Sequence, residues 1–174
     1  MVCFGELKLA IDHATMKTWG EPAEQNLYLQ EHVSRLLVSF THWTGKSLIE
    51  TDVPIAEQAR WLFYAPFVLL SHNTAADPVL NYANRVALTL FELTWEELIA
   101  LPSRKTAEPS EREERERLLA TVSRQGYIDD YRGIRVTKSG RRFMIERATV
   151  WNLLDDNGAF YGQAATFRDW KFLD

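Results

Sequence analysis

The sequence predicts an α+β fold in which a five-stranded antiparallel sheet is flanked by helices and preceded by a helical extension. Three observations lead to this class. Helical periodicity dominates residues 1–66, two short strand-like segments and several helices follow, and three long strand-like segments complete the chain. The alternation of single strands and helices that produces a parallel sheet is absent.

The composition is that of a globular protein. The chain has 174 residues, of which 46% are hydrophobic, 25% charged and 12% aromatic, and its formal net charge is −4. These values exclude wholesale disorder, and the acidic balance argues against general binding to polyanions. The longest apolar run, residues 61–70, is too short to span a bilayer, and residues 1–10 do not resemble a signal peptide. We therefore expect a cytoplasmic protein with no membrane association.

Residues 1–66 are predicted to form a helical cap, which precedes a domain of residues 67–174. Within the cap, residues 24–43 are predicted to form an amphipathic helix whose apolar residues recur every three or four positions. Its apolar stripe consists of Leu29, Val33, Leu36, Leu37 and Phe40. A second helix is expected over residues 55–64, and Pro66 ends it because proline cannot continue a helix.

The domain begins with two short strands, predicted over residues 67–71 and 79–82 and separated by a polar loop. Asn84 then has the position of a helix N-cap, since its side chain can accept a hydrogen bond from the first helical turn. Thr94 and Glu97 have the spacing of a capping box, which predicts a second short helix.

Residues 108–124 predict a helix stabilised by Glu–Arg pairs four residues apart. The pairs are Glu108–Arg112, Glu111–Arg115 and Glu113–Arg117. We expect the buried side of this helix to consist of Leu118, Leu119 and Val122, and we expect Gly126 to end it.

Three antiparallel strands are predicted over residues 131–138, 142–154 and 160–168, joined by glycine-containing hairpin turns. The middle strand has apolar residues on both faces, so both faces of the sheet need cover. The helices of residues 84–124 can cover one face. The apolar stripe of residues 24–43 is available for the other, either from the same chain or from a partner chain, and the second arrangement would be a homodimer.

Several segments, taken in order, resemble PAS domains. Residues 84–98 resemble the Asn-capped helix and the Thr-x-Glu-Glu-Leu helix of that pattern, and residues 138–143 resemble its later hairpin. Arg168-Asp169 matches the pair that commonly closes the fold. More specifically, residues 67–174 resemble the MEKHLA branch of PAS-like domains. That branch occurs in small bacterial proteins and at the C-terminus of plant class III homeodomain–leucine-zipper regulators.

The resemblance implies a sheet packed against a few helices around a central cavity, which holds a small ligand or is simply a filled core. The sequence departs from the PAS pattern at Glu92, where glycine is usual, and it lacks the hexapeptide that names the MEKHLA branch. A covalent flavin adduct is disfavoured because Cys3 is the only thiol. Haem bound by the long helix is disfavoured because residues 108–124 contain no histidine.

Strand alternation predicts what lines that cavity, because side chains two residues apart share a face. If the side chains alternate between the two faces as they do in other PAS domains at the Lys138 hairpin, nine residues face inward. They are Arg135, Phe143, Ile145, Arg147, Thr149, Trp151, Gln163, Ala165 and Phe167. Two arginines and a glutamine among apolar side chains suit an anionic ligand. The alternative is that both arginines face water, and a one-residue bulge would reverse the assignment.

Four further residues are candidates for the same site, namely His72, Tyr82, Trp95 and Tyr131. His72 closes the first predicted strand, where PAS cavities often open, but a lone histidine is more often a hydrogen-bonded structural residue. The three aromatic residues combine an apolar ring with a polar tip, which suits a cavity lining as well as an ordinary core.

Residues 131–147 are rich in arginine and lysine. A nucleic-acid patch is one interpretation, and charged strand positions that deter aggregation are the other. The second is favoured because the whole chain is acidic, so no nucleic-acid partner is expected.

The sequence contains no motif of a metal hydrolase, a serine nucleophile or a dinucleotide-binding fold. We therefore predict a non-catalytic sensory or interaction module that binds a small ligand, with an anion as the candidate that the arginines suggest. It would signal through a homodimer or a partner protein, contacted by the N-terminal helix and the sheet. A small enzyme using the same cavity and a ligand-free dimerisation domain are the alternatives.

Overall fold

The computed structural model describes residues 19–49 and 52–173. Within them, antiparallel pairing joins five strands in the order β2-β1-β5-β4-β3, and a sixth strand, β6, pairs with β4. The strands are β1 (Val68–His72), β2 (Leu80–Ala83), β3 (Tyr127–Val136), β4 (Arg142–Leu154), β5 (Phe160–Phe167) and β6 (Asp169–Phe172). The predicted α+β class and its five strands are confirmed. Strand β6 lies beyond the last predicted strand.

Strand β6 continues the path of β5 after a break at Arg168. One half of β4, from Thr149, pairs with β5, and the other half, up to Glu146, pairs with β6. Asp169 therefore begins a strand, and the Arg168-Asp169 pair does not end the fold. The additional strand lets β4 form hydrogen bonds along most of its length.

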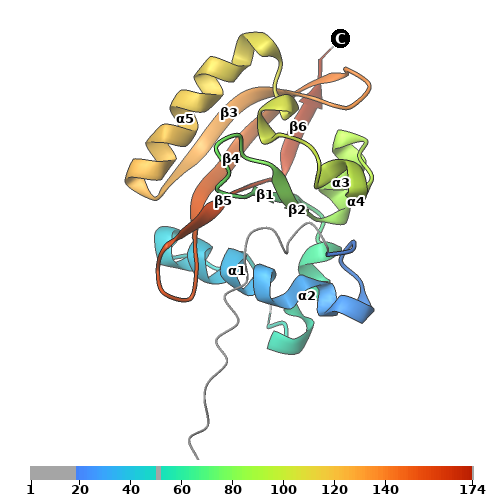
Figure 1. Cartoon of the computed structure of the whole chain (residues 1–174), viewed down its shortest axis with the longest axis vertical. Helices are drawn as coiled ribbons and strands as arrows, with labels where there is room; N and C mark the ends of the chain where they lie inside the picture. Colours follow the sequence, from blue (N-terminus) through green and yellow to red (C-terminus); the bar gives the residue numbers. More distant parts are fainter. Residues whose placement is uncertain (1–18, 50–51, 174) are drawn as a thin grey trace, which may run out of the picture.

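The helices are α1 (Gln30–Thr44), α2 (Ile55–Phe63), α3 (Arg85–Phe91), α4 (Trp95–Leu98) and α5 (Arg112–Gln125), with short 3-10 segments at Glu24–Leu29, Ser103–Thr106 and Pro109–Glu111. In Figure 1, α1 and α2 lie together below the sheet, whereas α5 lies beside β3 at its upper side. Two neighbouring residues of β4 show that the two groups cover opposite faces. Trp151 packs against Phe40 of α1, with 5.0 Å between ring centroids, and the Asn152 side chain donates to the carbonyl of Val122 in α5 at 3.0 Å.

The predicted helix of residues 24–43 is divided at Leu29. Leu27, Tyr28 and Leu29 have φ angles of 51°, 53° and 57°, in the left-handed region, so the regular helix begins only at Gln30. This turn buries Tyr28, whose ring lies 6.0 Å from that of Phe63. Tertiary packing has therefore overridden a helical periodicity that continues through the turn.

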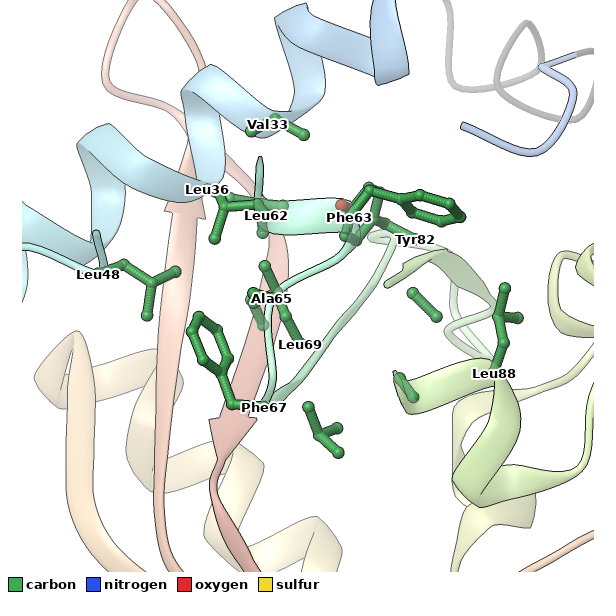
Figure 2. Close-up of a cluster of buried hydrophobic side chains, with 14 of the residues drawn as sticks. Val33, Leu36, Leu48, Leu62, Phe63, Ala65, Phe67, Leu69, Tyr82 and Leu88 are labelled. Carbon is green, nitrogen blue, oxygen red and sulfur yellow. The ribbon is translucent and has the colours of Figure 1, made fainter. Parts of the chain in front are cut away.

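The cap and the sheet share one hydrophobic core, part of which Figure 2 shows. Leu36 of α1 and Leu62 of α2 meet Phe67 and Leu69, and all four side chains are at most 1% exposed. Each buried leucine or phenylalanine contributes about 1.5–3 kcal/mol. The second apolar face of the sheet is thus covered by the same chain, and the core runs across Pro66, where the division between cap and domain is predicted.

The predicted capping box of α4 is confirmed, because Thr94 accepts from the Glu97 amide and the Glu97 carboxylate accepts from the Thr94 amide. Glu92, which replaces the usual glycine, has φ 60° in the left-handed region. Its carboxylate accepts from the Ser139 amide at 3.0 Å and lies 3.8 Å from Arg141. These contacts to the β3–β4 hairpin offset the conformational cost of a side chain at this position.

Asn84 is the buried polar group that fixes where α3 begins. Its Oδ1 accepts from the amides of Leu69 at 3.1 Å and Ala87 at 3.2 Å, and its Nδ2 donates to the carbonyls of Leu62 at 3.2 Å and Phe67 at 2.7 Å. The predicted N-cap is confirmed. The same side chain also ties α2 and β1 to α3.

We expect Asn84→Ala to lower the free energy of unfolding by at least about 3 kcal/mol, because it leaves buried amides and carbonyls without partners. Urea unfolding followed by tryptophan fluorescence measures the change. Asn157→Ala is the control, since Asn157 is exposed in the β4–β5 turn, and it should cost less than about 0.5 kcal/mol. A loss below about 1 kcal/mol for Asn84→Ala would contradict this network.

Candidate functional site

A cavity of about 60 Å³ lies between the sheet and α5. Its walls are mostly apolar and come from every one of strands β1 to β5, from α3 and from α5. Its polar lining residues are Ser71, His72, Thr106, Arg115, Tyr131, Arg135 and Gln163. A space of this size holds a few water-sized occupants, since a single water needs at least about 10–15 Å³. It is far smaller than the roughly 300–1,000 Å³ of pockets for drug-sized ligands.

Six of the ten sequence-predicted site residues line this cavity, namely His72, Tyr131, Arg135, Ile145, Gln163 and Phe167. They come from β1, β3, β4 and β5, so the predicted strand phase holds for the first half of β4 and for β5. Ala165, also predicted to face inward, lines the cavity as well.

The predicted lining needs correction in the second half of β4. Arg147 has φ 52°, and one extra β4 residue is accommodated between the pairs Tyr131–Ala148 and Gly133–Ile145. This bulge shifts the alternation by one residue. Val150 consequently lines the cavity in place of Thr149 and Trp151.

The displaced residues have other roles. Arg147 is exposed and donates to Asp169 at 2.6 Å, and the Thr149 hydroxyl donates to Asp129 at 2.7 Å. Trp151 is fully buried against the cap helix α1. Phe143 is buried against Phe91, with 5.3 Å between ring centroids, and does not reach the cavity.

Tyr82 and Trp95 also lie away from the cavity. Tyr82 is fully buried beside His32 of α1, with 5.5 Å between ring centroids, and burial raises the pKa of its hydroxyl. The Trp95 indole donates to the carbonyl of Trp19 at 2.9 Å. Both are core residues, which is the alternative that the sequence left open for them.

Arg115 is the charged cavity residue that sequence reasoning missed. The expected surface pair between Glu111 and Arg115 is not among the ion pairs of the described residues, whereas the Glu113–Arg117 pair forms. Arg115 is only 8% exposed and faces the cavity. Leu118, Leu119 and Val122 follow Arg115 by three, four and seven residues, so Arg115 lies on the buried face of α5. This helical spacing is the sequence feature that predicts its burial.

The two cavity arginines are buried cations. Arg135 is also 8% exposed, and it donates to the Ile134 carbonyl at 2.8 Å and to the Tyr131 hydroxyl at 3.4 Å. Neither Arg115 nor Arg135 forms an ion pair with a carboxylate in residues 19–49 and 52–173. Burial, and then the charge of Arg135, lower the pKa of Arg115 to about 10. The Arg115 guanidinium remains charged at neutral pH.

His72 presents an unpaired acceptor. Its Nδ1 lies 2.8 Å from the Asn73 carbonyl oxygen, which can only accept, so Nδ1 carries the proton and Nε2 carries the lone pair. Nε2 is buried and has no hydrogen-bond partner. Burial, and then the charge of Arg115, lower the pKa of His72 to about 4, so the ring is neutral at pH 7.

Both hydrogens of the Gln163 side-chain amide are engaged by acceptors on α5 and β4. Its Nε2 lies 3.1 Å from each of the Leu119 carbonyl, the Ser123 hydroxyl and the Asn152 Oδ1. The polar side chain of Gln163 lies close to His72 and partly opposes the lowering of its pKa. With both of its hydrogens turned toward these acceptors, however, the amide cannot donate to His72 Nε2.

A buried hydrogen-bond chain lies on the cap side of β1. His32 Nε2 is 2.9 Å from the Ser71 hydroxyl, which donates to Asn81 Oδ1 at 2.7 Å. Because that hydroxyl has one hydrogen, His32 must be the donor to Ser71. Burial, and then the charge of Arg35, lower the pKa of His32 to about 3.

Five basic side chains of the β3–β4 region lie beside acids. The pairs are Arg132–Glu146, Lys138–Glu97, Arg141–Glu92, Arg142–Glu108 and Arg147–Asp169. In the described part of the chain, no cluster of three or more histidine, cysteine, aspartate or glutamate residues could hold a metal ion. None of the described helices is long and apolar enough to cross a membrane. Cys3, on which the flavin argument depends, lies outside the described residues.

The sheet order, the helices on its cavity face and the central cavity define a PAS-like fold. The PAS domain of a Colwellia psychrerythraea protein is similar, with a TM-score of 0.57 and 18% sequence identity over 65% of this chain and 93% of that one. A light-oxygen-voltage domain studied with a flavin analogue is similar with a TM-score of 0.52 and 16% identity, over 67% of this chain and 84% of that one. At these identities the likeness concerns the fold alone.

The chain belongs to the MEKHLA domain family, whose model matches residues 30–172. This match includes α1. The homeobox-leucine zipper protein ATHB-9 of Arabidopsis thaliana is 35% identical over 103 residues, 59% of this chain and 12% of that protein. ATHB-14 of the same plant is 28% identical over 139 residues, 78% of this chain and 16% of that protein. The chain thus corresponds to a small part of these relatives.

The two buried histidines predict acid sensitivity. Their pKa values are lowered to about 3 and about 4, so between those values and about 6.5 the unfolded chain binds protons that the native protein does not. Stability therefore falls as pH falls below about 6.5, by up to about 1.4 kcal/mol per pH unit for each histidine. Urea midpoints from pH 7.5 to 4.5 measure this change. His32→Asn and His72→Asn should each reduce the slope relative to wild type, and an unchanged slope in both would contradict the assignment.

Proposed function

We propose that the protein is a sensory or interaction module that binds a small anion in the cavity and transmits its occupancy to a protein partner. One observation carries the proposal. Arg115 and Arg135 are buried cations that face one cavity without a carboxylate partner in the described residues. A pair of like charges so placed is stabilised by a bound negative charge.

The chemistry of the guanidinium group supports an oxyanion as the ligand. Arginine carries several N–H donors in a planar fork that matches carboxylate geometry, and such charge-assisted hydrogen bonds are stronger than neutral ones. Arg135 uses donors on the Ile134 carbonyl and the Tyr131 hydroxyl and retains others, since the guanidinium has five N–H groups. The surrounding apolar walls lower the local dielectric and strengthen the attraction.

Strand β1 connects the cavity to the cap. His72 lines the cavity, and the adjacent Ser71 accepts from His32 of α1. A ligand that repositions His72 acts on the same short strand that holds α1 in place. Helix α5 provides a second connection, because Gly126 at its end packs so closely on Trp43 of α1 that a Cβ would lie 2.2 Å from the indole ring.

The Ser71–His32 pair does not support the alternative of an enzyme. A nucleophilic serine must donate its proton to the base, whereas this hydroxyl donates to Asn81 and accepts from His32. Burial also keeps the pKa of His32 near 3, so this imidazole is a weak base. The geometry is that of a structural connection between cap and sheet.

We expect small carboxylates to stabilise the protein. In a low-chloride buffer, acetate at 100 times its dissociation constant should add about 2.7 kcal/mol to the free energy of unfolding. Thermal unfolding with increasing sodium acetate measures this, with sodium fluoride at equal ionic strength as reference. Arg115→Gln and Arg135→Gln should each weaken the effect at least 10-fold in concentration. Arg147→Gln, on the exposed bulge, is the matched control and should leave it unchanged.

A ligand-free dimerisation domain would give a different result. Under that alternative, acetate and fluoride shift the unfolding temperature equally. The two cavity arginine variants then respond to acetate as wild type does.

Self-association through the cap is the second expected property. Val38 of α1 is 66% exposed although the neighbouring Leu37 packs against the core, and an exposed apolar residue on the N-terminal helix suits contact with a second copy. Light scattering over increasing protein concentration should show a dimer that Val38→Asp dissociates. Thr89→Asp, on the exposed side of α3, is the control. A wild-type protein that stays monomeric up to millimolar concentration would contradict a homodimer.

A further inference from the structure

We propose that Tyr131 is the third donor of the anion site: its hydroxyl donates a hydrogen bond to the bound anion, beside the guanidinium groups of Arg115 and Arg135. This inference rests on the proposed anion site and adds a ligand-binding residue to it. Three features carry the inference. They are the hydrogens that the cavity lining leaves free, the place of Tyr131 on β3, and the close approach of its hydroxyl to Gly133.

Four neutral polar residues of the cavity lining have no donor hydrogen left for a ligand. The Ser71 hydroxyl donates to a side chain of β2 at 2.7 Å, and the Thr106 hydroxyl donates to the Ser103 carbonyl at 2.7 Å. The donor groups of His72 and Gln163 are engaged by the neighbouring backbone and by acceptors on α5 and β4. An anion in the cavity needs donors, so these four residues cannot hold it.

Tyr131 is the fifth neutral polar residue of the lining, and it retains its hydrogen. Arg135 donates to the Tyr131 hydroxyl at 3.4 Å, and because a guanidinium can only donate, the phenol oxygen is the acceptor in this bond. The hydroxyl hydrogen therefore points elsewhere. No acceptor for it is found within residues 19–49 and 52–173. Tyr131 can thus donate to a ligand that the cavity holds.

Two bulges set the direction of the Tyr131 side chain. Before it, β3 has one extra residue near Asp130, whose φ is 58°, and after it β4 has one extra residue near Arg147. From Tyr131 onward β3 alternates regularly, so Tyr131, Gly133 and Arg135 share a face. Tyr131 and Arg135 both line the cavity, which identifies that face as the cavity face.

Gly133 makes room for the hydroxyl. A Cβ at position 133 would lie 2.3 Å from the Tyr131 hydroxyl oxygen, which is far inside the van der Waals distance. Gly133 is not among the described glycines with a left-handed φ, so its backbone does not itself require glycine. The close approach of the phenol requires it. The missing side chain at Gly133 therefore lets the hydroxyl of Tyr131 reach Arg135 along the cavity face of β3.

Tyr131 is close to both cavity cations. The guanidinium carbon of Arg135 lies over the Tyr131 ring, 5.4 Å from its centroid. Burial and the charge of Arg135 lower the pKa of Arg115, and the nearby Tyr131 opposes this shift.

The three donors come from two elements. Arg115 belongs to α5, whereas Tyr131 and Arg135 belong to β3, and α5 lies beside β3 in Figure 1. The two oxygen atoms of a carboxylate have several lone pairs, so one carboxylate can accept from all three side chains. Such a ligand ties α5 to β3.

The test is isothermal titration calorimetry of the full chain at pH 7 with sodium acetate in a low-chloride buffer. Tyr131→Phe should weaken acetate binding at least about 10-fold, because it removes a hydrogen bond to a charged group. Tyr127→Phe is the matched control, since Tyr127 lies on the same strand but does not line the cavity. It should change the affinity less than about 2-fold.

Gly133→Ala displaces the hydroxyl without removing it. It should weaken acetate binding about as much as Tyr131→Phe does. Combined with Tyr131→Phe it should add less than about 2-fold, because the hydroxyl that it displaces is already absent.

Carbon-13 NMR of the wild-type tyrosines gives a readout that does not depend on a folded Tyr131 or Gly133 variant. The Cζ resonance of Tyr131 should shift as acetate saturates the site, because the hydroxyl then donates to the carboxylate. The Cζ resonance of Tyr127 should not shift. In Arg115→Gln, the same acetate concentration should shift the Tyr131 resonance less.

The outcomes distinguish this inference from the proposed function. If Arg115→Gln weakens acetate binding and Tyr131→Phe does not, the inference about Tyr131 is wrong and the anion site stands. If Tyr131→Phe and Tyr127→Phe weaken binding equally, Tyr131 acts only through the stability of β3, and the inference is again wrong. If acetate does not bind to the wild-type protein, both proposals fail.

Discussion

The bulge in β4 at Arg147 is the constraint on which the rest of the structure depends. Because β4 is covered on both faces, each of its side chains must point to the face where it packs. Arg147, in the left-handed region, shifts the alternation of side chains by one residue in the middle of the strand. Ile145 and Val150 can therefore face the same cavity, although they are five positions apart, an odd spacing that places residues of a regular strand on opposite faces. The break between β5 and β6 at Arg168 occurs at the corresponding position of the neighbouring strand, so the two strands change face together.

The sheet separates the core on the cap side from the cavity on the other side, and strand β1 contacts both. The cap side is a buried core in which Trp151 packs against Phe40 and His32 is held neutral by burial. The other side holds the small cavity with its two cations. Strand β1 touches both, since the Ser71 hydroxyl bonds to His32 on the cap side and the next residue, His72, lines the cavity. This arrangement supports the proposed transmission from the cavity to the cap, because a change on one face of a short strand displaces the other.

Sequence reasoning located the helices, five of the strands and six of the ten candidate residues. It succeeded where the evidence is local: the N-cap of Asn84 and the capping box of Thr94 each involve neighbouring residues. It failed at Arg147 and Arg115 for related reasons. A bulge has no sequence signature when no glycine occupies it, so strand alternation alone predicts an inward side chain for Arg147. The acids near Arg115 suggested a surface pair, whereas the apolar residues three and four positions later place it on the buried face of α5.

Periodicity, capping residues and hairpin turns were enough to fix the fold class, because each depends on contacts within a few residues. The apolar residues on both faces of the middle strand also predicted that other elements pack against both faces of the sheet. Contacts between distant segments decided that α1 of the same chain supplies this cover and that Arg115 and Arg135 share the cavity. They also decided which two histidine nitrogens lack a hydrogen-bond partner. Register, bulges and burial are set when those segments pack together, so these features became visible only in the folded chain.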